Sequence, residues 1–163
     1  MKRIVVVVAA AAGAVAAAAW AGGFVTTSPA APAGRQVYYG HIRSIAPHGS
    51  KLWLRFDPAW FLSGVTASRA KLEDTGSADV PNDNYVVEEG HRLLTFVLPT
   101  TARVTVLTND GSGISSTPIP VSELRRIVAG RTTKHKLFEP LESGVWIRVR
   151  IDTVQEVDQQ YRP

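Results

Sequence analysis

The strongest constraint on the fold is a strict alternation of apolar and polar residues in two short runs. Residues 51–56 read KLWLRF, and residues 145–151 read VWIRVRI. A period of two is typical of a β-strand that has one buried and one exposed face. We therefore expect one set of residues to face a common core, namely Leu52, Leu54, Phe56, Val145, Ile147, Val149 and Ile151.

Further runs with strand character are separated by turn residues. They cover residues 36–46, 85–87, 92–98, 103–108 and 154–158. Turn-forming residues at 47–50, 88–91, 109–111 and 152–153 favour hairpin connections. About seven short strands of this kind predict a mainly β (α+β) fold, a small antiparallel sheet curled or closed into a barrel. A barrel like that of oligonucleotide/oligosaccharide-binding domains (OB-like) is the first candidate.

Two or three short helices are expected beside this sheet. Asp57 can cap a helix that has Pro58 as its first residue, which predicts one helical turn at residues 59–62. A second short helix is predicted over residues 67–72. Large aromatic residues at such positions, Trp60 among them, usually pack into the core.

The clearest helical pattern covers residues 121–128. Its apolar residues recur at helical spacing, and Gly130 stands where a helix end favours glycine. The pattern places Glu123, Arg125 and Arg126 on the outer face. The basic stretch that follows, residues 131–136, is predicted to be a solvated loop.

The N-terminal segment has the pattern of an export signal. Lys2 and Arg3 precede an apolar, alanine-rich run, and the next charged residue is Arg35. This pattern predicts a signal peptide over residues 1–21, cleaved after Ala21 or, as a second choice, after Ala33. The alternative is an uncleaved membrane anchor that reaches residue 25. Residues 22–35 would form a flexible leader and residues 36–163 a single β-rich domain.

Charge and cysteine content exclude several classes of function. Removal of Lys2 and Arg3 would lower the formal net charge from +4 to +2, so nucleic acid is not an expected partner. The chain has no cysteine. Disulfides, a nucleophilic thiol and a lipid-modified N-terminal cysteine are therefore excluded.

Three motifs resemble those of a known group of proteins. They are RFDPAWFLSG at residues 55–64, VPNDNY at residues 80–85 and DQQY at residues 158–161. Together they resemble a group of small exported bacterial proteins, some of them lipoproteins, without an assigned activity. The resemblance covers most of residues 37–163 and implies the class alone, because the group has no known site residues. This chain differs from the lipoprotein members because it lacks the anchoring cysteine.

Catalytic and metal-binding motifs are weak. The histidines, His41, His48, His91 and His135, lack the short spacing that builds a zinc site, and no metal or cofactor is expected. Oxygen-rich side chains between residues 73 and 84 could hold calcium, but their spacing matches no calcium-loop pattern. No Gly-x-Ser-x-Gly motif is present, although a dispersed Ser-His-Asp site would leave no such signal.

One constellation favours binding. If the apolar residues of the two alternating runs face inward, each strand turns one indole and two cations outward. These residues, the candidate binding face, are Lys51, Trp53, Arg55, Trp146, Arg148 and Arg150. Such a face can stack on rings and attract anions. The alternative is that a helix covers the tryptophans and the cations only solvate their strands.

The sequence therefore predicts an exported, non-enzymatic binding or accessory module of the cell envelope. Its expected partner is an anionic cell-wall polymer or another envelope protein, with membrane contact only through an uncleaved N-terminal segment. A small secreted hydrolase and a structural envelope component are the two alternatives. Concave clustering of Ser or Asp with a histidine would favour the hydrolase, and a flat exposed Trp/Arg face would favour binding.

Overall fold

The part of the chain that the structure describes contains eight strands, two α-helices and one 3₁₀ helix. The computed structural model describes residues 34–88, 90, 92–109, 111 and 113–162. The predicted signal peptide and most of the predicted leader lie outside these residues. Within them the elements are β1 (Gln36–His48), β2 (Lys51–Ser63), α1 (Gly64–Thr75), β3 (Asn84–Val87), β4 (Leu94–Leu98), β5 (Arg103–Asn109), β6 (Ile114–Ile119), α2 (Val121–Val128), η1 (Leu141–Ser143), β7 (Val145–Arg150) and β8 (Thr153–Gln159).

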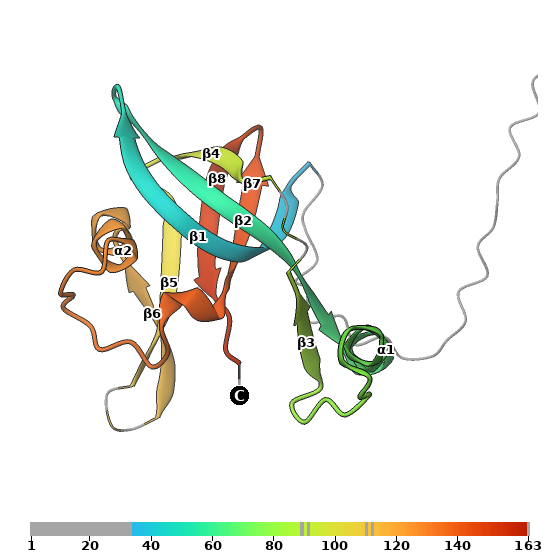
Figure 1. The fold of residues 1–163 in the computed structure, drawn as a ribbon. Coiled ribbons are helices and arrows are strands. Elements are labelled where there is room, and N and C mark those ends of the chain that lie inside the picture. Colours follow the sequence, from blue (N-terminus) through green and yellow to red (C-terminus); the bar gives the residue numbers. More distant parts are fainter. Residues whose placement is uncertain (1–33, 89, 91, 110, 112, 163) are drawn as a thin grey trace, which may run out of the picture.

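Five strands close into a barrel, which confirms the predicted mainly β fold (Figure 1). β1 pairs with β2 and β7, β2 pairs with β4, and β7 pairs with β8, all antiparallel. A parallel contact between Val97 of β4 and Thr153 of β8 closes the ring. β5 continues along the same edge of β8, and α2 comes between β5 and β7 in the chain. This connectivity is that of an OB-like barrel.

The barrel interior is apolar, as the period-two pattern predicts. Leu54, Phe56, Val145, Ile147 and Val149 are buried in it. Val104 and Val106 of β5 join the same core, and β5 and β6 form the hairpin predicted around residues 109–111. Since one face of each strand is sealed by barrel closure, hydrophobic burial selects the register that the sequence indicates.

The helix predicted at residues 59–62 is wrong, because β2 continues through Asp57 and Pro58 to Ser63. Asp57 does not cap a helix; its Oδ2 accepts a hydrogen bond of 2.8 Å from Arg43 Nε. Pro58 lies where one edge of β2 changes partner, after the Phe56–Leu94 pair and before the Trp60–Val87 pair. A strand position with an unpaired edge tolerates proline.

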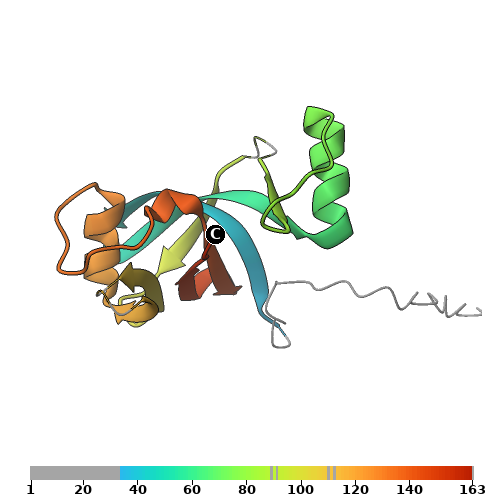
Figure 2. The same cartoon turned by 90° about the horizontal axis from the view of Figure 1, so that it is seen from below.

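The hairpin predicted between residues 85–87 and 92–98 is also wrong. β3 and β4 each pair antiparallel with β2, at different places along its length. The predicted helix at residues 67–72 exists as the longer α1, which ends before Gly76 in the left-handed conformation (φ 76). Figure 2 shows α1 and β3 to one side of the barrel and α2 on the other side.

The closing hairpin of β7 and β8 is present, but its turn differs from the predicted one. Ile151 and Asp152 form the turn, with φ values of 47° and 55°. The prediction that Ile151 faces the core is wrong, since 84% of this residue is exposed. Two consecutive residues with positive φ reverse the chain before the alternation reaches Ile151.

Candidate functional site

The candidate binding face lies on two strands that are not neighbours, a point that the alternation of the two runs left open. The sheet order places β1 between β2 and β7. The prediction that Trp146 is exposed is wrong, since only 8% of it is exposed. Its ring centroid lies 5.1 Å from that of Tyr39 and 5.9 Å from that of Phe61, and Nε1 donates to Gln160 Oε1. The continuation of β2, which the sequence did not predict, supplies Phe61 to this contact.

Arg148 is held by carboxylates on the neighbouring strand. Its Nη1 lies 2.8 Å from Glu156 Oε2 and also contacts Asp158 Oδ2. Arg103 approaches the same Glu156 at 3.1 Å. The charge of Arg148 is therefore compensated within the barrel wall, and the expectation that it attracts an external anion loses its basis.

The other four residues of the candidate binding face, Lys51, Trp53, Arg55 and Arg150, are exposed. Trp53 is 38% exposed and stacks on His48, with ring centroids 3.6 Å apart and an interplanar angle of 22°. Backbone pairing joins Trp53 to Val97, Val97 to Thr153, and Thr153 to Arg150. Trp53 and Arg150 therefore lie on one wall, three strand spacings or about 14 Å apart. We call Lys51, Trp53, Arg55 and Arg150 the β2–β7 wall.

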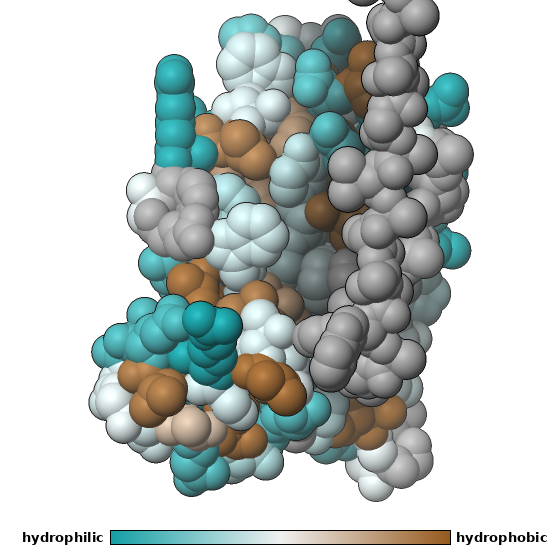
Figure 3. Space-filling view, turned by 90° about the vertical axis from the view of Figure 1, so that its right-hand side faces the viewer, coloured by the Kyte–Doolittle hydropathy of each residue, from teal (hydrophilic) through white to brown (hydrophobic). Residues whose placement is uncertain are grey.

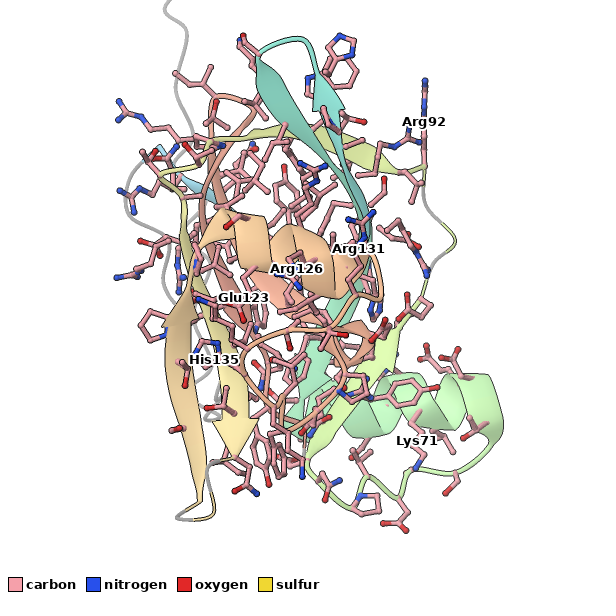
Figure 4. The ribbon with its side chains drawn as sticks, turned by 90° about the vertical axis from the view of Figure 1, so that its left-hand side faces the viewer. Lys71, Arg92, Glu123, Arg126, Arg131 and His135 are labelled. Atoms are coloured by element: carbon pink, nitrogen blue, oxygen red, sulfur yellow. The ribbon has the colours of Figure 1, made fainter. Side chains whose placement is uncertain are left out.

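A different surface brings three arginines to one hollow. Helix α2, the residues that follow it as far as Arg131, and Ile45 of β1 surround a hollow of about 340 Å³. Arg125, Arg126 and Arg131 line it with Ser122, and its described lining contains no carboxylate. Arg126 donates to the Thr132 carbonyl at 2.8 Å, which holds the start of the loop against the helix. Figure 4 shows Arg126 on α2 and Arg131 beside it. We call these three arginines the basic hollow.

The loop after α2 is anchored by a buried carboxylate. Glu123 is only 8% exposed, which corrects the prediction that it lies on the outer face of the helix. His135 Nδ1 lies 3.0 Å from Glu123 Oε1, and the Lys134 backbone N–H donates to the same oxygen at 3.2 Å. In Figure 4 both side chains lie below Arg126 and Arg131. In the loop at residues 131–136, which was predicted to be solvated, the cations are exposed and the His135 side chain is held by Glu123.

The electrostatics of Glu123 follow from these contacts. Burial by itself raises the pKa of a carboxyl group, because it disfavours the charged form. The hydrogen bond from His135, the Lys134 backbone N–H and the charge attraction of His135 outweigh it, so the pKa of Glu123 is lowered. Glu123 is the one carboxylate of residues 121–136, and its partners are His135 and the Lys134 backbone N–H. The exposed cations of this stretch are therefore available to other partners.

Sequence reasoning did not identify the basic hollow, although a signal was present. Residues 125–136 contain five Lys and Arg residues and no Asp or Glu. This density predicts a positive surface. What the sequence did not show is that the helix and the loop fold against each other.

The other polar candidates do not assemble into a metal site. Within the part of the chain that the structure describes, no three His, Asp or Glu side chains are placed to share a metal ion. In the oxygen-rich loop, Asp74 instead accepts a hydrogen bond from Tyr85, and the Asp79 carbonyl accepts one from Lys71. His41 pairs with Glu88 at 2.6 Å, whereas His91 lies outside the described residues.

The fold and the site define a class, a small OB-like barrel with a basic helix–loop surface. Comparison with known proteins gives no match to a family model, to a curated protein or to a solved structure. The resemblance to small exported bacterial proteins therefore stays a prediction from its three motifs. None of the helices described here has the length and apolar character needed to cross a membrane.

Proposed function

We propose that the protein is an exported, non-enzymatic binding module of the cell envelope that holds an anionic wall polymer at the basic hollow. Export rests on the N-terminal pattern of residues 1–21. The observation that carries the binding role is the convergence of Arg125, Arg126 and Arg131 on one hollow without a carboxylate in its described lining. The candidate binding face supports this role less well, because Trp146 is buried and Arg148 is paired.

Guanidinium groups are suited to this task. They stay charged at all physiological pH values and bind phosphate or carboxylate oxygens through two parallel hydrogen bonds. The three arginines are on one helix and its adjoining loop, so one repeat of a polymer can contact all of them. Lys134 and Lys136 on the same loop are exposed and extend the positive surface. A polymer that presents many anionic repeats gains affinity by rebinding, which compensates for weak individual contacts.

Binding of soluble poly(glycerol phosphate) to the full chain tests this proposal. We expect a triple variant, R125Q/R126Q/R131Q, to lose most of the binding measured by calorimetry at low salt. The matched control is K51Q/R55Q/R150Q, which removes the same charge from the β2–β7 wall and should bind like the unmodified chain. Binding should weaken as salt rises, because exposed charges are screened over about 10 Å at 0.1 M ionic strength.

Two results would contradict the proposal. Equal losses in both triple variants would show that binding follows net charge and not the basic hollow. Tighter binding of DNA than of poly(glycerol phosphate) would assign the surface to nucleic acid.

The alternatives of a small secreted hydrolase and a structural envelope component stay predictions. The two histidine–carboxylate pairs, His135–Glu123 and His41–Glu88, lie on different parts of the fold.

A further inference from the structure

An apolar groove lies away from the basic hollow, beside the first half of β1 and the second half of β2. Its volume is about 640 Å³, within the range of pockets that enclose one small molecule. Its walls include Tyr38, Tyr39, Trp60, Leu94 and Trp146, with Arg92 at the rim. In Figure 3 white and brown side chains gather around a hollow on this side of the molecule.

The groove is aromatic because β2 extends beyond the barrel. Beyond Asp57, this strand carries Ala59 and Phe61 against Tyr39 and Trp146, forming a second apolar cluster outside the main core. Trp60 leaves the same strand on the other face but still borders the groove, and it is 55% exposed, so the prediction that it packs into the core is wrong. An exposed indole beside a concave apolar wall leaves a large area that a ligand can bury.

Three aromatic side chains of the groove walls donate their polar hydrogens to partners within the protein. Tyr39 donates its hydroxyl to the Ser143 carbonyl at 2.9 Å, and Tyr38 donates to Gln36 Oε1 at 2.8 Å. Burial raises the pKa of Tyr39 to about 12, so this hydroxyl stays neutral at physiological pH. Trp146 donates its indole N–H to Gln160. A sugar, which needs several hydrogen bonds, fits such walls poorly, and a hydrocarbon chain fits them well.

Arg92 determines the polarity of the ligand. It is exposed, and it is the one charged residue in the described lining of the groove. A hydrocarbon chain on the aromatic walls places the end of the ligand near this rim, where a guanidinium can pair with a carboxylate. We propose that the groove binds a single-chain carboxylate amphiphile, a free fatty acid by chemical class. This site is separate from the basic hollow and does not depend on the proposed polymer binding.

Titration of octanoate, decanoate and dodecanoate into the full chain, below their micellar concentrations, tests the proposal by NMR of the indole N–H groups. We expect the Trp60 and Trp146 resonances to shift saturably and that of Trp53, which lies outside the groove, to stay unchanged. Each added methylene that enters the groove should lower Kd by up to about fourfold. Kd values independent of chain length, or an equal shift at Trp53, would overturn the proposal.

A second comparison tests the role of Arg92. The unmodified chain should bind decanoate about two- to fivefold more tightly than decanol, the range expected for an exposed ion pair. Arg92→Gln should abolish this preference and keep the response to chain length, whereas the control Arg55→Gln should keep both. Equal affinity of the unmodified chain for decanol and decanoate would overturn the carboxylate assignment. A Trp60 shift on dilution alone would assign the groove to a second copy of the chain.

Discussion

Replacement of Glu123 by glutamine tests how the loop after α2 is held. The His135 ring nitrogen Nδ1 lies 3.0 Å from Glu123 Oε1, and the Lys134 backbone N–H donates to the same oxygen at 3.2 Å. The Glu123 side chain is buried. Glutamine has nearly the same shape but no charge. Its carbonyl oxygen can still accept the bond from Lys134, so the variant removes the charge-assisted part of the anchor without leaving a cavity.

The expected loss of stability follows from the contacts. A hydrogen bond to a charged group contributes roughly 1.5–3 kcal/mol, and the larger values belong to fully buried pairs. The His135 side chain is 39% exposed, so solvent screens its share. We expect Glu123→Gln to lower the free energy of unfolding by about 1–2 kcal/mol at pH 7.

The lowered pKa of Glu123 determines how the loss of stability in Glu123→Gln varies with pH. Because folding lowers the pKa of Glu123, its ionised form favours the folded state, and the stabilisation is fully present above the usual value of 4.5. It is lost as the pH falls through the lowered pKa of the folded state. The difference in stability between the unmodified chain and Glu123→Gln should therefore be largest near pH 7 and shrink towards zero below the folded pKa.

Urea unfolding of both proteins at several pH values measures this difference. Glu142→Gln on η1 is the matched control, since Glu142 is exposed, and we expect it to change stability by less than about 0.5 kcal/mol. A Glu123→Gln difference that stays constant from pH 7 to strongly acidic pH would refute the reasoning. It would show that the amide fits poorly, rather than that the charge of Glu123 anchors the loop.

Two further substitutions test the barrel itself. Gly40→Ala should lower the free energy of unfolding by about 1–3 kcal/mol, the usual cost of overpacking, measured by thermal or urea unfolding. The added Cβ would lie 2.1 Å from the Asp57 carbonyl oxygen and 2.9 Å from Pro58 Cα, and an unchanged midpoint would contradict this close approach. Ile151→Asn should raise the free energy of unfolding by about 1 kcal/mol, and the midpoint with it, because a β-branched residue is strained at φ 47° and asparagine is not. A lower midpoint would show that the exposed isoleucine contributes packing.

The period-two runs predicted the interior of the barrel because closure buries one face of each strand. Val145, Ile147 and Val149 face the core as expected. The same rule does not determine whether residues on the outer face are exposed, because this depends on which other segments pack over them. Trp146 is buried there by Tyr39 and Phe61, two residues from other strands. Alternation in one strand carries no information about such long-range cover.

The Asp57-Pro58 pair shows where a local rule is overridden. Asp followed by Pro is a common start of a helix, because the side chain caps and the ring presets φ. Here β1 pairs with β2 on both sides of this dipeptide, with Gly40 opposite Pro58 and His41 opposite Asp57. Extending the existing β-ladder between β1 and β2 gains more free energy than one isolated helical turn would, because helix nucleation is unfavourable.

The basic hollow could be anticipated in charge but not in shape. The density of cations at residues 125–136 is visible in the sequence, and solvation was the simplest expectation for it. Convergence depends on Glu123 and His135, twelve residues apart, and on a carboxylate that the helical pattern assigns to the solvent face. A contact between two residues that each fit a solvated position leaves no pattern in the sequence.

The two proposed sites are lined by different residues, and this separation makes them independently testable. The basic hollow lies at α2 and its loop, on the left of Figure 1, with Ile45 of β1 in its lining. The groove lies along the first half of β1 and the second half of β2, on the side shown in Figure 3. Their described linings share no residue. Charge removal at Arg125, Arg126 and Arg131 should therefore leave the Kd for decanoate unchanged, and Arg92→Gln should leave polymer binding unchanged. A barrel with both sites could hold a polymer and an amphiphile at the same time.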